Sequence, residues 1–253
     1  MKMSFVIPAY NEEASIGACI RAVRRRVRAA GCDAEIIVVN NASTDRTGEV
    51  ASAWPGVRVI SEPRKGLLHA RQRGFEESRG ELLACIDADT LVPRGWIEKG
   101  LRAFARSPQL MCLTGPYMYH DLSPLVRVIV ILWYMVSDLW AGYINQYIFR
   151  TGALIQGGNY IVRRSALEKI GGYDTSIAFY GEDTALARRL IPFGKVRFSF
   201  RLSLPASGRR LRKEGVLWTG VAYAANGISV LARGRPSTHR YTDIREPGVA
   251  AGR

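Results

Sequence analysis

Asp87 and Asp89 have the residue type and the spacing that suit a divalent cation. They follow the apolar run of residues 82–86, with only Ala88 between them. Two carboxylates in this position can reach a hard cation such as Mg²⁺ or Mn²⁺, which keeps ligand phosphates in its coordination shell. Aspartate is also common in ordinary turns after strands. The buried strand predicted before the pair favours the metal-binding interpretation.

A second carboxylate pair, Glu182 and Asp183, is predicted to begin a helix that ends before Pro192. A carboxylate at a helix N-terminus is kept ionised by the helix dipole and by free amides. At an ordinary pKa of about 3.9, an aspartate here could take a proton from an acceptor hydroxyl late in the transition state. Simple capping of the helix is the alternative interpretation.

Basic residues gather at Arg209 and Arg210, directly after the flexible Gly208. Guanidinium groups can hold phosphate oxygens in a bidentate way, although a solvated basic face is the alternative. The whole chain of 253 residues has 36 Lys and Arg against 22 Asp and Glu, a formal net charge of +14. This balance favours phosphates, nucleic acid or acidic lipid headgroups as partners, without choosing among them.

Strands and helices alternate through the first third of the chain. The sequence predicts strands at 4–9, 35–39, 57–60 and 82–86, with helices at about 11–30, 43–54 and 66–78. Such alternation predicts an α/β fold with a Rossmann-like, mostly parallel sheet flanked by helices, in which ligands bind beyond the carboxyl ends of the strands. Polar residues 10–12, 40–41 and 87–89 follow three of these strands. They should therefore meet at one edge of the sheet.

Residues 125–149 form an apolar segment in which Arg127 and Asp138 are the only charged residues. A membrane-spanning helix needs about 20 mostly apolar residues, and polar residues interrupt this segment. One or two amphipathic helices against a bilayer or a partner subunit, and an ordinary pair of core helices, are both open interpretations. A spanning helix would have to divide an α/β domain whose second half carries further site-like residues.

The rest of the chain gives weaker indications. A strand is predicted at 160–162, helices at 165–170, 182–190 and 215–232, and a mobile tail after the last helix. The four cysteines show no metal-binding spacing, which indicates a reducing compartment; they are Cys19, Cys32, Cys85 and Cys112. The apolar run at residues 5–7 is too short for a secretory signal.

The ordered set of motifs resembles that of family 2 glycosyltransferases, over roughly residues 3–213. The motifs are PAYNEE at 8–13, NNASTD at 40–45, DAD at 87–89, GN at 158–159, GGYD at 171–174 and GED at 181–183. The resemblance implies a GT-A fold and an inverting transfer from a nucleotide-diphosphate sugar with a divalent cation, Mg²⁺ or Mn²⁺. We expect a GT-A domain at 1–213 containing the apolar helical segment 122–150, a C-terminal helix at 214–235 and a mobile tail at 236–253.

The resemblance also implies a role for each matching residue. On the donor side, the base and ribose pocket would be lined by Pro8, Tyr10 and Glu12, with Asn41 and Asp45 beside the base and Arg71 in contact with the nucleotide. Asp87 with Ala88 would face the ribose and diphosphate, and Asp89 would hold the metal. Arg209 and Arg210 would lie on a basic loop that closes on the diphosphate. On the acceptor side, Gly158 and Asn159 would shape the pocket, and Asp183 would be the catalytic base beside Glu182.

The expected function is transfer of a sugar to a hydroxyl acceptor, a membrane-associated glycolipid or cell-envelope glycan precursor. We expect a cytoplasmic protein on the inner face of the cytoplasmic membrane, with an anionic membrane surface but no specific nucleic acid as partner. Residues 125–149 could instead join copies of the chain into a homo-oligomer.

Two departures from the family pattern and two other functions remain open. Asn40 and Asn41 replace a common acidic pair, which leaves the donor base open, and Gln72 replaces the usual asparagine after the arginine. A sugar-phosphate nucleotidyltransferase would share the sheet and the metal, but it needs a glycine- and basic-rich loop where residues 8–16 are acidic. The second alternative is a non-catalytic module that binds anionic membranes or nucleotides.

Overall fold

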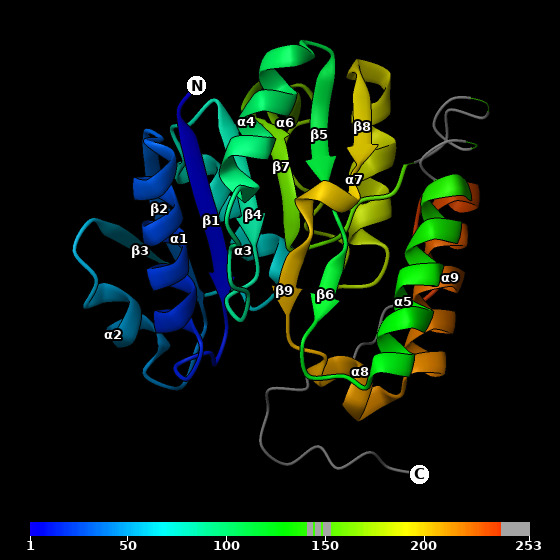
Figure 1. The fold of residues 1–253 in the computed structure, drawn as a ribbon, viewed down its shortest axis with the longest axis horizontal. Helices are drawn as coiled ribbons and strands as arrows, with labels where there is room; N and C mark the ends of the chain where they lie inside the picture. Colours follow the sequence, from blue (N-terminus) through cyan, green and yellow to red (C-terminus); the bar gives the residue numbers. More distant parts are fainter. Residues whose placement is uncertain (141–143, 145–147, 149–152, 239–253) are drawn as a thin grey trace.

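A computed structural model describes residues 1–140, 144, 148 and 153–238 of the chain (Figure 1). Part of the apolar segment 122–150 and most of the expected tail 236–253 therefore lie outside the described residues. Within the described residues, one seven-stranded sheet has the order β3-β2-β1-β4-β7-β5-β8. Its strands are β1 (Met3–Ala9), β2 (Ala34–Asn41), β3 (Val57–Glu62), β4 (Leu82–Ile86), β5 (Leu110–Thr114), β7 (Asn159–Arg163) and β8 (Lys195–Phe198).

The expected mostly parallel α/β sheet is confirmed. β1 pairs in parallel with both β2 and β4, and β2 pairs in parallel with β3. β7 runs antiparallel to β4 and β5, whereas β8 is parallel to β5. The four N-terminal strands therefore point their carboxyl ends to one edge of the sheet.

Helices cover both faces of the sheet, because side chains of a strand alternate between faces. On β1, Phe5 and Ile7 belong to one buried core, while Val6 belongs to the other. The first core is covered by α1 (Ile16–Ala30) and α4 (Trp96–Arg106), and the second by α3 (Leu67–Glu77), α6 (Arg164–Lys169) and α7 (Glu182–Leu190). The short α2 (Thr47–Ser52) precedes β3.

A smaller part of the structure lies beyond the main sheet. It contains the parallel strand pair β6 (Tyr117–Tyr119) and β9 (Leu204–Ala206), and the helices α5 (Pro124–Ser137), α8 (Arg209–Glu214) and α9 (Val216–Arg233). Figure 1 shows α5 and α9 at one end of the molecule, with α8 at their foot. The expected apolar helix is thus confirmed as α5. Among the described residues, no helix combines the length and the apolar character needed to cross a bilayer.

Several elements were not predicted from the sequence. They are α4, β5, β6, β8, β9 and the two 3₁₀ turns η2 (Ile191–Phe193) and η3 (Phe200–Leu202). The strands among them have only three to five residues, too few for a period of two to stand out. Arg209 and Arg210 begin the helix α8, so the expected basic loop is wrong at these positions.

Candidate active site

The polar residues that follow β1 and β2 meet at the carboxyl edge of the sheet. Ala9 lies opposite Asn40 in the β1–β2 register. The loops beyond are tied together, since the backbone N–H of Asn11 donates to Ser43 Oγ (3.1 Å) and that of Thr44 donates to Asn11 Oδ1 (2.9 Å). Asn11 has a φ of +51°, a left-handed conformation that asparagine tolerates better than most residues. The sharp turn brings the following Glu12 back over the edge of the sheet.

Two carboxylates, Glu12 and Asp89, contact one guanidinium group at this edge, and the charge of Asp87 acts on Asp89. Arg209 Nη2 lies 2.8 Å from Glu12 Oε1 and 2.8 Å from Asp89 Oδ2. The pKa of Asp89 is raised, first by its burial and then by the negative charges of Asp87 and Glu12. Arg209 lowers it and so offsets part of this repulsion. The cluster thus carries more negative charge than its own arginine neutralises.

The cluster fits a divalent cation held partly by its ligand. Among the described residues, no set of three or more His, Cys, Asp or Glu is placed to hold a metal by itself. Mg²⁺ and related cations are commonly bound by one or two carboxylates together with substrate phosphates. Asp87 and Asp89 could supply these carboxylates, and the negative charges of Asp87 and Glu12 near Asp89 would favour a cation there.

Asp87 is held in place from two sides. Its Oδ2 accepts a hydrogen bond of 2.7 Å from the Tyr117 hydroxyl, which also lies 2.8 Å from the carbonyl oxygen of Gly157. Gly158 has a φ of +78°, and a Cβ there would lie 2.3 Å from the Asp87 carboxyl group. Glycine is therefore required at 158 both by the backbone conformation and by the close approach of Asp87.

Arg71 joins the donor-side carboxylates to the second pair. Its side chain is 1% exposed, and its Nη1 lies 2.6 Å from Glu182 Oε1, while its Nη2 lies 3.9 Å from Asp87 Oδ1. The guanidinium also lies 5.6 Å from the ring centre of Tyr160. Because Arg71 is this deeply buried, it faces Glu182 and Asp87 from the interior of the protein.

Asp183 has an ionisation suited to proton transfer near neutral pH. The pKa of its carboxyl group is raised to about 7, first by removal from water and then by the charge of Glu182. The nearby Arg71 and the N–H of Thr184 lower it but do not offset the burial. The expectation of an ordinary pKa of about 3.9 is therefore wrong. The sequence shows the helix start but not the packing that removes this carboxyl from water.

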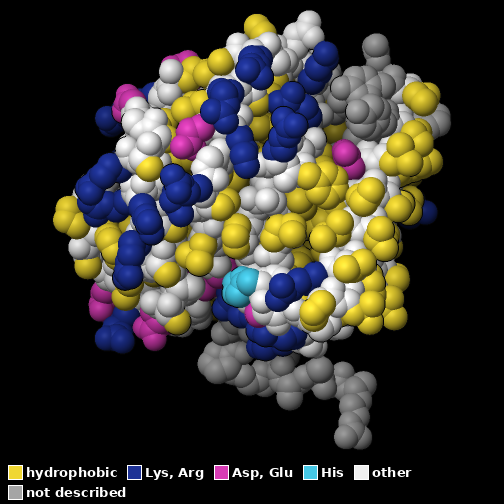
Figure 2. Space-filling model, in the orientation of Figure 1, with side chains coloured by type: hydrophobic (Ala, Val, Ile, Leu, Met, Phe, Trp, Pro, Cys, Tyr) yellow, Lys and Arg dark blue, Asp and Glu magenta, His cyan; other side chains and the backbone are white. Residues whose placement is uncertain are grey.

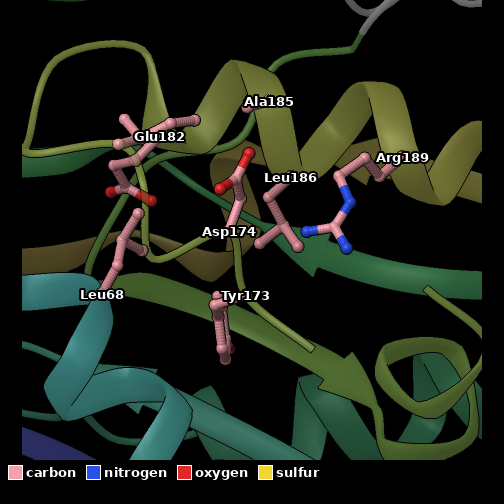
Figure 3. Close-up of a pocket in the computed structure, with 8 residues that line it drawn as sticks. Leu68, Tyr173, Asp174, Glu182, Ala185, Leu186 and Arg189 are labelled. Carbon is pink, nitrogen blue, oxygen red and sulfur yellow. The ribbon is translucent and has the colours of Figure 1, made fainter. Parts of the chain in front are cut away.

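Two cavities lie beside Leu68 near the start of α3, and the smaller one also borders Glu182. The smaller, of about 10 Å³, lies beside Leu68, Tyr173 and Glu182 (Figure 3) and has room for no more than a water molecule. The Glu182 Oε2 atom is buried without a protein partner. The larger cavity, of about 480 Å³, lies between the start of α3 and the loop 175–178, and Lys65 and His69 are among its lining residues. Its size is that of a small-molecule site.

The residues expected on the nucleotide side differ in their exposure and in their hydrogen-bond partners. Tyr10 is half-buried, and its hydroxyl accepts a 3.0 Å hydrogen bond from Lys65 Nζ. Pro8 and Ala88 are buried. Asn41 is buried, with its amide N–H groups donating to the carbonyls of Glu62 and Arg64 and its Oδ1 accepting from Gly66 N–H. Its side chain therefore anchors a loop of the protein.

Asp45, Asn159 and Arg210 also have partners within the protein. Asp45 accepts hydrogen bonds from the N–H groups of Glu13 and Thr47. Asn159 is fully buried; its Oδ1 accepts from Trp96 Nε1, and its Nδ2 donates to the Gly115 and Leu202 carbonyls. Arg210 Nη1 lies 2.6 Å from Glu214 Oε1. The contacts of Asn159 favour a role in fixing the first residue of β7.

Sequence reasoning missed three residues that shape this site. Tyr117 orients Asp87, Lys65 contacts Tyr10, and Tyr223 of α9 lies near Asp183. The pKa of Tyr223 is raised by removal of its hydroxyl from water, with the negative charge of Asp183 adding to this effect. Aromatic residues far along the chain give no local signal for such contacts, so only the fold could assign them.

A sheet of this order, with carboxylates gathered at its carboxyl edge, defines the GT-A class of α/β proteins. The sequence profile described as Glycosyl transferase family 2 matches residues 4–171, which is more than half of the chain. The chain therefore belongs to the family 2 glycosyltransferases, and the resemblance seen in the motifs is confirmed.

Individual relatives show how far the similarity extends. The chain is 28% identical over 212 residues to probable glycosyltransferase YdaM of Bacillus subtilis strain 168, covering 78% of this chain and 48% of the relative. It is 38% identical over 97 residues to an undecaprenyl-phosphate 4-deoxy-4-formamido-L-arabinose transferase of Pseudomonas paraeruginosa, covering 36% of this chain and 29% of the relative. The chain thus spans about half or less of the length of these two relatives.

Solved structures confirm the GT-A fold. Glucosyl-3-phosphoglycerate synthase from Mycobacterium tuberculosis, in complex with Mn²⁺, uridine-diphosphate-glucose and phosphoglyceric acid, superposes with a TM-score of 0.62. The two proteins are 21% identical, and the match covers 94% of this chain and 81% of the synthase chain. At this identity the likeness concerns the fold alone.

Proposed function

We propose that this chain is a metal-dependent, inverting glycosyltransferase that moves a sugar from a nucleotide-diphosphate sugar to a hydroxyl acceptor. One observation supports the proposal: Arg71 lies 2.6 Å from Glu182 and 3.9 Å from Asp87, so a donor-side carboxylate and the neighbour of the predicted base Asp183 lie around one guanidinium group. This arrangement would allow a leaving diphosphate and an attacking hydroxyl to approach the same anomeric carbon from opposite faces.

On the donor side, Asp89 and Asp87 would hold Mg²⁺ or Mn²⁺ beside the diphosphate. A bound cation there supplies neutralisation of the charge that develops on the leaving diphosphate. Arg209 pairs with Asp89 and Glu12 and carries a second positive charge to this position. Tyr10 and Lys65 border the nucleotide side, where Tyr10 offers its ring for stacking on the base. This assignment agrees with the solved relative that binds Mn²⁺ and a uridine-diphosphate sugar.

On the acceptor side, Asp183 would be the general base. Its ionised carboxylate takes the proton from the acceptor hydroxyl while that oxygen attacks the anomeric carbon. The bond between the anomeric carbon and the diphosphate oxygen breaks in the same displacement, which releases the nucleoside diphosphate and inverts the configuration. A base with a pKa of about 7 is well matched to this transfer at neutral pH.

The acceptor that we propose is a lipid-linked glycan precursor or glycolipid at the inner face of the cytoplasmic membrane. The net charge of +14 favours an anionic membrane surface. One relative carries undecaprenyl-phosphate in its name. Transfer to an acceptor of this kind would have to take place close to lipid.

A panel of nucleotide sugars, tested by thermal shift with and without Mn²⁺, examines the donor assignment. We expect one donor to raise the melting temperature in a metal-dependent way and Asp89→Ala to lose this effect. Asp33→Ala is the matched control, because Asp33 is exposed and precedes β2 at the opposite edge of the sheet. Undiminished metal-dependent binding by Asp89→Ala would remove Asp89 from the site.

The same assay separates the two alternative functions. Stabilisation by a nucleoside triphosphate and a sugar 1-phosphate, but not by any nucleotide sugar, would favour a nucleotidyltransferase. Donor binding without metal-dependent cleavage of the sugar–diphosphate bond would favour a non-catalytic binding module.

A further inference from the structure

α5 and α9 expose large apolar side chains to an unusual extent. The most exposed on α5 are Leu125 (70%) and Val136 (66%), and on α9 they are Leu217 (83%) and Trp218 (70%). Further exposed members are Val128, Ile129, Leu132, Trp133, Met135, Val221 and Ile228. Figure 2 shows a broad band of apolar side chains at the end of the molecule where Figure 1 draws these helices. Contiguous patches of this kind mark interaction or membrane surfaces.

Each helix is attached to the active site by its other side. Tyr134 is the buried side chain of α5, and its hydroxyl donates to Gln156 Oε1 (2.7 Å), beside Gly157. On α9, Tyr223 packs edge to face on Tyr180 at 5.3 Å, and Val230 lies against Gly181. Tyr180 and Gly181 directly precede Glu182 and Asp183. The outward apolar face is thus attached to the acceptor side of the cleft.

The two helices also lie close to each other. Burial raises the pKa of Tyr134, and Tyr223 is among the smaller causes, which places the two hydroxyls near one another. We call the exposed residues of α5 and α9 the α5–α9 face. It adjoins the part of the cleft that contains Asp183.

We propose that the α5–α9 face lies on an anionic lipid bilayer and that a lipid-linked acceptor passes from this bilayer to Asp183. This inference rests on the proposed function and names the partner of its acceptor side. The acceptor's lipid end would remain along the apolar face while its hydroxyl reaches the base.

Charge favours a bilayer over a second copy of the chain. The sequences of α5 and α9 contain no aspartate or glutamate, and their charged residues are Arg127 and Arg233. Arg235 follows α9, whereas Arg212 of α8 is already paired with Asp121 at 3.0 Å. A symmetric dimer through this face would bring these like charges together, whereas acidic headgroups would neutralise them.

Aromatic residues point to the same occupant. Trp133, Trp140 and Trp218 are 46%, 53% and 70% exposed. Tryptophan is enriched at the level of lipid headgroups, where its ring is apolar and its N–H stays hydrated. Helices that lie in this interface combine such side chains with basic residues.

The test is flotation of the purified chain with vesicles of phosphatidylcholine and phosphatidylglycerol, compared with phosphatidylcholine alone. We expect wild type to float with the anionic vesicles and to be partly released by salt. Leu217→Glu should lower the partition coefficient by about tenfold to a hundredfold, the loss expected when one large apolar side chain is no longer buried. Arg233→Gln should lower it by about fivefold. Phe193→Glu is the matched control, since Phe193 is 41% exposed but lies outside both helices.

Circular dichroism melting checks that each variant is folded, and sedimentation without lipid gives the oligomeric state. No flotation of wild type, or equal flotation of Leu217→Glu and wild type, would overturn the proposal. A wild-type dimer that Leu217→Glu converts to a monomer would assign the face to a second copy instead. Flotation does not require donor or metal, so its failure is distinguishable from failure of the proposed glycosyl transfer.

Discussion

Two arginines neutralise carboxylates on the two sides of the cleft, and they do so in different ways. On the donor side, Arg209 reaches Glu12 and Asp89 from α8, and its side chain is 36% exposed. On the acceptor side, Arg71 pairs with Glu182, and both side chains are buried, at 1% and 8% exposure. The half-exposed Arg209 can leave when another cation takes over its carboxylates, of which Glu12 is only 2% exposed, whereas the buried Arg71 cannot leave without stranding its partner. On the proposed donor side, Arg209 can therefore be replaced by another cation, whereas the Arg71–Glu182 pair on the proposed acceptor side stays in place.

The largest effect is expected for Asp183→Asn, which should separate catalytic turnover from donor binding. This variant keeps the shape of the side chain but cannot accept a proton. Turnover should fall by about 10²–10⁴-fold, the usual contribution of a general base, while donor affinity measured by calorimetry stays near wild type. Glu182→Gln is the companion variant: if it is inactive while Asp183→Asn is near normal, the base lies one residue earlier.

The contrast between the arginines is tested by the pair Arg71→Met and Arg209→Met. Removing one member of a buried ion pair typically costs about 3–5 kcal/mol, and a solvated pair about 0–1 kcal/mol. Urea unfolding should therefore show a larger loss of stability for Arg71→Met than for Arg209→Met, because Arg209 is 36% exposed although its partner Glu12 is buried. Equal losses in the two variants would remove the distinction between a fixed and an exchangeable arginine.

The pH dependence of turnover should follow the ionisation of the Asp183 carboxyl group. Only the ionised form of Asp183 accepts a proton, and its raised pKa of about 7 means that this form is lost as the pH falls through neutrality. Turnover at saturating substrates should drop roughly tenfold between about pH 8 and about pH 6. Asp183→Asn should show a flat profile over this range. A wild-type rate that is constant down to about pH 5 would show that the working base has an ordinary carboxyl pKa.

The smallest effect is expected for Arg209→Gln, which should change the affinity for Mn²⁺ alone and the affinity for the nucleoside diphosphate in opposite directions. The proposed cation would compete with Arg209 for oxygens of Asp89, so the variant should bind Mn²⁺ alone about two- to tenfold more tightly. Its affinity for the nucleoside diphosphate with Mn²⁺ should fall, because the arginine no longer contacts phosphate. Both are measured by titration calorimetry, with Arg212→Gln as control. Weaker Mn²⁺ binding by Arg209→Gln would mean that Arg209 organises the carboxylates and does not compete with the cation.

Much of the donor side could be predicted because it is local in sequence. The strands β1, β2 and β4 have apolar runs long enough to recognise, and parallel strands bring their following residues to one edge. Asp87 and Asp89 therefore came together with Glu12, as expected. The side chain of Asn41 shows the limit, since its contacts with the loop at residues 62–66 depend on a turn that the pattern does not specify.

The acceptor side depends on contacts between distant parts of the chain. The sequence by itself determined that Glu182 and Asp183 begin a helix after Gly181, because glycine and acidic residues favour such a start. It also indicated helical structure in the apolar segment 125–149, in which the structure places most of α5. Tertiary structure decided that Arg71 lies under Glu182, that burial raises the pKa of Asp183 to about 7, and that α5 and α9 form one face. Burial and pairing depend on which distant side chains exclude water from a group, and only the folded chain brings those side chains together.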